Sequence, residues 1–205
     1  MDQDTLKYYA QNADAVAARY ESIVNKLSYS FGDAFIPSSR ILDVGCGSGR
    51  DLATLASLGH DCFGIDGTPE FVELAQKLHP ELGGRITHGT LPNSEIPFGG
   101  GFDGVLCSAV LMHLPADQLE LSAAFIRNCL KEPGRLLYSV PSKRLDVGNK
   151  DRDQHGRLFL PDQSDRLEKI FEQHGLRVIK RWGDSDSFCR GEVEWVSVLM
   201  QVESA

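Results

Sequence analysis

The sequence predicts an α/β fold with a doubly wound, mostly parallel seven-stranded sheet and one antiparallel strand from a C-terminal hairpin. Two observations lead to this fold class. Between residues 40 and 140, short apolar segments alternate with segments whose apolar residues recur at helical spacing. Alternation of this kind places helices on both faces of a parallel sheet. After residue 175, two apolar segments follow each other closely, which indicates the hairpin.

Composition describes an ordinary globular chain and excludes several function classes. Of 205 residues, 41% are hydrophobic and 24% are charged, close to the globular average. The formal net charge of −8 and the absence of a run rich in lysine and arginine argue against a nucleic-acid partner. No stretch approaches the roughly 18 apolar residues of a membrane span, and the acidic start is unlike a signal peptide. We therefore expect a cytoplasmic protein with no membrane partner.

The cysteines carry no sign of a disulfide framework. There are 5 of them, widely and irregularly spaced, and no two form a Cys-x-x-Cys pair. This pattern predicts reduced thiols, mostly in the core, and no metal site.

The first elements follow from apolar periodicity and from helix breakers. Residues 3–27 carry apolar side chains at steps of three and four, which predicts one amphipathic helix. Gly32 and Pro37 predict a loop over residues 31–39. Thr68 is the expected N-cap of a helix whose first residue is proline. In chain order, the elements expected after the loop are a strand at 40–44, a helix at 50–58, a strand at 61–66 and a helix from Pro69 to about Leu78.

The second half contains the remaining strands and one long polar segment. Residues 141–161 are polar and carry both signs of charge, which predicts a long loop. The other expected elements are a weak strand near 85–88, a loop at 89–101, a strand at 102–107, a helix at 115–130, a strand at 135–140, a helix at 162–174 and strands at about 176–182 and 192–202.

The most informative motif lies where the first strand meets its helix. It reads Asp43-Val44-Gly45-Cys46-Gly47-Ser48-Gly49-Arg50. Glycines there allow a tight turn and the close approach of a ligand, and the amides that open the next helix favour an anionic group. Dinucleotides and S-adenosylmethionine are both held in this way. The dinucleotide fingerprint requires a small third residue at position 50, which is occupied here by arginine.

This motif, with Asp66 and the run from Phe102 to Leu114, resembles the class I S-adenosylmethionine-dependent methyltransferase superfamily, in particular its small-molecule branch. Order and spacing agree over residues 38–140. The resemblance implies a Rossmann-like methyltransferase fold, S-adenosyl-L-methionine as cofactor and S-adenosyl-L-homocysteine as its product. We expect a single domain over residues 1–205. Its parts are an N-terminal lid helix at 1–30, a cofactor-binding core at 38–140, and a substrate-side loop, helix and C-terminal hairpin at 141–205.

The resemblance also implies cofactor contacts. Asp66 accepts hydrogen bonds from the ribose hydroxyls. Asp43 holds the glycine loop and the amino-acid end of the cofactor, or has a purely structural role. The branch often has an acid after a glycine to bond adenine; here Thr90 stands at that place, and Leu91 covers the ring face. The full set of expected cofactor-binding residues is Tyr9, Tyr20, Asp43, Gly45, Cys46, Gly47, Arg50, Asp66, Gly67, Thr90, Leu91 and Ser108.

Catalytic and substrate residues are expected beyond the fourth strand. His113 is a candidate general base, or it orients the loop before the next helix. Arginines can bind an acidic small molecule bidentately, although solvated loop charges give the same pattern. The candidate substrate-binding residues are Tyr8, Arg144, Arg157 and Arg190.

The expected reaction is transfer of a methyl group to a small-molecule acceptor by in-line displacement. The sulfonium is already activated, so the enzyme aligns the acceptor, excludes water and removes a proton where needed. No Asn-Pro-Pro-Tyr motif follows the fourth strand, which disfavours DNA bases as acceptors. We expect a monomer or homodimer. The alternatives are a non-catalytic regulatory or partner protein that binds the same cofactor and, less favoured because of Arg50, a nicotinamide-dependent oxidoreductase.

Overall fold

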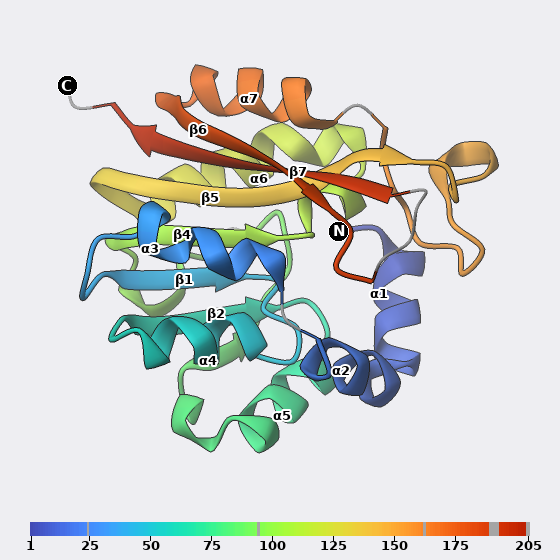
Figure 1. Ribbon diagram of the computed structural model, residues 1–205, viewed down its shortest axis with the longest axis horizontal. Coiled ribbons are helices and arrows are strands. Elements are labelled where there is room, and N and C mark those ends of the chain that lie inside the picture. The colour runs from blue at the N-terminus through green and yellow to red at the C-terminus, as the bar shows by residue number, and fades with distance from the viewer. Residues whose placement is uncertain (24, 94, 162, 189–192, 204–205) are drawn as a thin grey trace.

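A seven-stranded sheet forms the centre of the computed structural model, which describes all residues except 24, 94, 162, 189–192 and 204–205. The strand order is β3-β2-β1-β4-β5-β7-β6 (Figure 1). Within the described residues, β7 alone is antiparallel to its neighbours, and the other pairings are parallel. The predicted fold class is confirmed. The strands are β1 (Arg40–Val44), β2 (Asp61–Asp66), β3 (Ile86–His88), β4 (Phe102–Ser108), β5 (Leu130–Arg144), β6 (Leu176–Ser185) and β7 (Val193–Val202).

Strand β5 is longer than the predicted 135–140. Its antiparallel ladder with β7 runs from Arg135 to Arg144, with a register shift after Pro141. The partner strand supplies hydrogen bonds to residues whose polar side chains indicated a loop. The segment expected to be a loop therefore begins as strand.

The N-terminal region differs from the predicted single helix over 3–27. The chain forms α1 (Gln3–Gln11) and α2 (Ala13–Glu21), separated at Asn12. The Asn12 amide donates to the Tyr8 carbonyl at 2.8 Å, which competes with the helical ladder and ends α1. The turn lets α2 pack on α5 through Ala13, Val16 and Phe71.

The predicted loop at 31–39 is also wrong in part. A short 3₁₀ helix η1 (Lys26–Ser30) leads into α3 (Phe31–Ala34). Phe31 and Phe35 are buried against the sheet, and this burial outweighs the breaker at Gly32. The remaining helices match the prediction closely: α4 (Arg50–Ser57), α5 (Pro69–Leu78), α6 (Leu119–Cys129) and α7 (Gln163–Gln173).

Helices cover both faces of the sheet, and two more lie at its carboxyl edge. Helices α6 and α7 bury Ile126 and Phe171 on one face, whereas α3 and α4 bury Phe31 and Leu52 on the other. Figure 1 shows α1 and α2 beside the arrowheads of β1, β2 and β4. This edge of a doubly wound sheet is where ligands bind.

Candidate functional site

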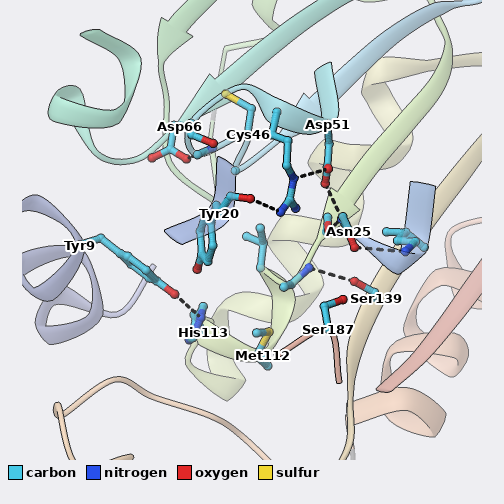
Figure 2. A pocket seen from close by; sticks show the side chains of 18 of the residues that line it. Tyr9, Tyr20, Asn25, Cys46, Asp51, Asp66, Met112, His113, Ser139 and Ser187 are labelled. Atoms are coloured by element: carbon cyan, nitrogen blue, oxygen red, sulfur yellow. Dashed lines mark hydrogen bonds and ion pairs between the residues drawn. The ribbon is translucent and has the colours of Figure 1, made fainter. Parts of the chain in front are cut away.

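One cavity opens at the carboxyl edge of the sheet. Its walls come from α1, α2 and η1, from the glycine loop after β1, from the ends of β2, β4 and β5, and from β7. Figure 2 shows Asp66 and Cys46 at one end of the set of side chains drawn, and Ser139 and Ser187 at the other.

The glycine loop is held in a conformation that a side chain would disturb. Gly45 and Gly47 have positive φ angles of 76° and 54°. A Cβ atom on Gly45 would lie 2.4 Å from Cγ2 of Val110. The main chain therefore passes close to the β4 end. The N–H groups of Gly45 and Cys46 donate to the Ile65 carbonyl, and that of Gly47 donates to Asp66, so these hydrogen bonds hold the turn in place. The amides that open α4, which begins at Arg50, are suited to an anionic oxygen.

Asp66 joins the ends of β1 and β2. One carboxylate oxygen accepts from the Gly47 amide and the other from the Thr68 amide, both at 2.8 Å. Burial raises the pKa of Asp66, and these two N–H donors oppose that rise. The side chain is 7% exposed and lines the cavity. Each oxygen keeps a free lone pair with which to accept from a ligand hydroxyl.

Behind the loop lies a cluster of acids and one arginine. Asp43 is 1% exposed, and its Oδ1 has no hydrogen-bond partner among the residues that the structure describes. Burial, with Asp51 and Asp66 nearby, raises the pKa of Asp43 well above its usual value. Arg50 bonds Asp51 at 3.1 Å and the Tyr20 carbonyl at 2.8 Å, so it ties α2 to α4 (Figure 2).

His113 and Tyr9 form a buried pair at the cavity wall. The ring nitrogen Nδ1 lies 2.5 Å from the Leu158 carbonyl, so Nδ1 carries the proton and Nε2 accepts from the Tyr9 hydroxyl at 3.3 Å (Figure 2). Arg157 donates to the same hydroxyl oxygen at 3.2 Å. Burial lowers the pKa of His113 to about 4, so the ring is neutral at pH 7. The pair can accept a proton at Nε2.

Two of the predicted substrate arginines, Arg144 and Arg157, already have carboxylate partners. Arg157 donates to Asp153 through Nε at 2.9 Å and through NH2 at 2.6 Å. Both of these bonds go to one oxygen of Asp153, whereas Arg144 donates to both oxygens of Asp146. The Arg144 guanidinium lies 3.6 Å from the centre of the Phe159 ring. Both arginines line the cavity.

The structure brings most of the predicted site residues together. Tyr8 stacks under Arg157 but is not on the cavity wall, and Arg190 lies outside the described residues. Thr90 and Leu91 are also absent from the cavity wall. Leu91 is instead buried in the core. The predicted residues on the wall are Tyr9, Tyr20, Asp43, Gly45, Cys46, Gly47, Arg50, Asp66, Gly67, Ser108, His113, Arg144 and Arg157.

Sequence reasoning missed several wall residues. Asn25 donates to Asp51 at 2.6 Å, and Asp186 accepts from the Trp195 indole at 3.0 Å. Ser139 and Ser197 are hydroxyl residues inside apolar strands. A serine between apolar neighbours, such as Tyr138 and Val140 or Val196 and Val198, is a signal for a polar site at the sheet surface. Only the strand register shows that the two serines are neighbours.

The described residues form neither a metal site nor a membrane-spanning helix. They contain no group of three His, Cys, Asp or Glu side chains arranged to hold a metal ion. None of their helices has the length and apolarity needed to cross a membrane.

Comparison with known proteins shows the family. Residues 10–181 match the model of a family described as "Methyltransferase domain", and the chain belongs to that family. The predicted class I methyltransferase resemblance is confirmed, and the family match decides against the oxidoreductase alternative.

Curated relatives and solved structures agree with this family. The chain is 35% identical over 111 residues to the mitochondrial ubiquinone biosynthesis O-methyltransferase of Schizosaccharomyces pombe, covering 52% of this chain and 39% of that protein. It is 33% identical over 117 residues to the ubiquinone biosynthesis O-methyltransferase of Xanthomonas campestris, covering 55% and 47%. This chain thus spans less than half the length of these relatives.

The similar structures establish the fold. One is a Burkholderia thailandensis 1,6-didemethyltoxoflavin-N1-methyltransferase with bound 1,6-didemethyltoxoflavin and S-adenosylhomocysteine, with a TM-score of 0.76, 18% identity and coverage of 98% and 88%. Another is a TehB-like SAM-dependent methyltransferase from Corynebacterium glutamicum, with a TM-score of 0.66, 22% identity and coverage of 94% and 99%.

Proposed function

We propose that this member of the methyltransferase-domain family transfers the methyl group of S-adenosylmethionine to a small-molecule acceptor. The observation that carries the proposal is Asp66, a buried carboxylate at the cavity wall with both oxygens oriented by main-chain N–H groups. A rigid carboxylate beside a glycine turn suits the two adjacent hydroxyls of a ribose. The family match supports the same activity.

The residues present fit this cofactor. The close approach at Gly45 leaves main chain, not side chain, facing the cavity, and the unpartnered Oδ1 of Asp43 lies beneath the same loop. Asp66 would hold the ribose, and Tyr20 and Arg50 lie where they would meet the amino-acid end. Thr90 and Leu91 stay proposed contacts to adenine.

The cofactor supplies a methyl group on a sulfonium, which an acceptor can attack directly. The chain's own task is to orient the acceptor and to receive its proton. When an acceptor hydroxyl or amine approaches Tyr9, the tyrosine oxygen takes its proton while the Tyr9 proton passes to Nε2 of His113. Arg157 stabilises negative charge on the tyrosine oxygen during this transfer.

Calorimetry with S-adenosylhomocysteine tests the assignment of Asp66. We expect micromolar binding by the wild type and at least about tenfold weaker binding by Asp66→Ala, because a charged hydrogen-bond acceptor is lost. Asp61→Ala is the matched control: Asp61 begins the same strand but is half exposed and pairs with Arg85. Equal affinity of wild type and Asp66→Ala would contradict the proposal.

A second measurement separates an enzyme from a non-catalytic binding protein. Folded protein with bound S-adenosylmethionine is offered a panel of small metabolites, and formation of S-adenosylhomocysteine is recorded. Binding without turnover of any member would favour the non-catalytic alternative.

The remaining assignments are part of the same proposal. The protein acts in the cytoplasm on a small molecule, without a nucleic-acid or membrane partner, as a monomer or homodimer. The net charge of −8 supports the absence of a nucleic-acid partner.

A further inference from the structure

Three serines form one row across three neighbouring strands at the cavity wall. Ser108 on β4 is the register partner of Ser139 on β5, which is in turn the partner of Ser197 on β7. All three line the cavity. Register partners point to the same face of a sheet, so the hydroxyls form a polar row with steps of about 5 Å from strand to strand. We call these residues the serine row.

The next row on the same face is entirely apolar. Two positions away from the serine row along each strand, Leu106, Leu137 and Leu199 are register partners and are no more than 2% exposed. The sheet face therefore changes from leucine to serine where the cavity begins. A hydroxyl at the border of a hydrophobic core needs a hydrogen-bond partner, which either the protein or a ligand can supply.

One hydroxyl of the row lacks a protein partner. The Ser139 hydroxyl accepts from the Ala109 amide at 3.1 Å, and the Ser108 hydroxyl accepts from Asn25 at 3.3 Å. Ser197 is 2% exposed, and the described part of the chain offers its hydroxyl no hydrogen bond. Because Ser197 lines the cavity, its hydroxyl can form a hydrogen bond with whatever occupies that cavity.

The charged groups around this part of the cavity largely compensate one another. Arg144 and Arg157 are each held by a carboxylate of their own segment. Lys26 lies against Asp186, which has the opposite charge, with Nζ 3.5 Å from its carbonyl oxygen. Arg19 is exposed and lies over the Phe188 ring. The part of the cavity beside the serine row therefore carries little net charge. This argues against the acidic substrate that the arginines alone indicated.

The rest of this part of the wall is apolar. Met112, Phe159 and Trp195 line it, and Val110 adds aliphatic surface beside the glycine loop. A molecule that fills such a space has an apolar body and a polar edge.

We propose that Ser139 and Ser197 bind the methyl acceptor and that the acceptor is an uncharged molecule with an apolar body and a hydroxyl or carbonyl edge. This inference rests on the proposed function. Because β4 adjoins β1 and its glycine loop, Ser108 lies on the cofactor side and the acceptor lies over β5 and β7.

A series of probes of similar size and different charge tests this proposal. Protein saturated with S-adenosylhomocysteine is titrated with a catechol ring that carries a hydroxymethyl, a carboxylate or an aminomethyl group. We expect the uncharged probe to bind at least about tenfold more tightly than either charged one. Preference for a charged probe, or no binding of any probe, would overturn the inference. Failure of S-adenosylhomocysteine itself to bind would count against the proposed function instead.

Serine variants then test whether the Ser197 hydroxyl binds the probe. We expect Ser197→Ala to weaken binding of the uncharged probe about tenfold, because one hydrogen bond is lost. The affinity for S-adenosylhomocysteine should stay within about twofold of the wild-type value. Ser197→Thr keeps a hydroxyl and should bind more tightly than Ser197→Ala. Ser122→Ala is the matched control, since Ser122 is buried in α6 outside the cavity. Equal probe affinity in Ser197→Ala and Ser122→Ala would refute the role of the row.

Discussion

The two halves of the cavity are built in different ways. The glycine-loop half uses main-chain N–H groups and acids between residues 43 and 68, with α2 behind them. The serine-row half uses side chains from α1, β5, the segment 151–160 and β7, which are far apart in the sequence. The first half needs a particular backbone conformation, whereas the second needs particular side chains brought together by packing.

This difference separates what the fold provides from what distinguishes one protein of the fold from another. One fold can support many reactions. The reaction that this protein catalyses therefore depends on the serine-row half. Variants in each half should have separate effects.

The largest effect is expected at the backbone of the glycine-loop half. Gly45→Ala forces an unfavourable positive φ and places Cβ 2.4 Å from the Val110 methyl group. We expect a loss of about 3 kcal/mol in the free energy of unfolding and much weaker S-adenosylhomocysteine binding. Urea denaturation and calorimetry measure the two effects. Gly47→Ala is the control: its φ is also positive but its Cβ would meet nothing within 4 Å, so a cost as large as that at Gly45 would contradict this reasoning.

The next largest effect is on the pH dependence of stability, and it arises from His113, the buried histidine of the serine-row half. Because burial lowers the pKa of His113 from 6.5 to about 4, the unfolded state binds a proton in this range that the native state does not. Stability should therefore fall as pH decreases from 6.5 to 4, by about 3 kcal/mol for this group. The groups that face His113 are Tyr9, Arg157, Arg144 and Asp153.

Unfolding free energies at several pH values, for the wild type and His113→Gln, isolate this contribution. The difference between the two proteins should shift by about that amount across the range. A constant difference would show that folding leaves the pKa of His113 unchanged, contrary to its burial.

The smallest effect concerns the ion pair that fixes α1. Asp2 caps α1 by accepting from the Thr5 amide at 2.9 Å and pairs bidentately with Arg152. Asp2→Asn keeps a capping side chain but removes the charge, so we expect a loss of about 1 kcal/mol at pH 7. The pKa of Asp2 is lowered to about 2, so its contribution is complete above pH 3.8 and is lost as pH falls through 2.

Thermal unfolding checks this prediction. Asp4→Asn is the matched control, because Asp4 is on the same helix but 71% exposed and 3.6 Å from Arg152. An equal loss in both variants would mean that general charge near α1, not the Asp2 pair, stabilises the helix.

Local signals predicted some elements well. The helix at Pro69–Leu78 and the strand at Asp61–Asp66 are confirmed with their predicted bounds, because the proline start and the apolar run act within a few residues. The helix at 3–27 was wrong because the Asn12 side chain and the packing of α2 on α5 outweigh a continuous apolar stripe. Strand β5 extends beyond its prediction because it pairs with β7, which lies far along the chain: Arg144 pairs with Val193.

The sequence by itself determined the fold class, the family and the glycine-loop half of the cavity, because a turn at a strand–helix junction depends on residues that are neighbours in the chain. Only the tertiary structure decided that Arg144 and Arg157 are paired with carboxylates, that Tyr9 meets His113, and that three serines share one row. These arrangements depend on strand register and on packing between distant segments, and no local pattern of residues encodes a register.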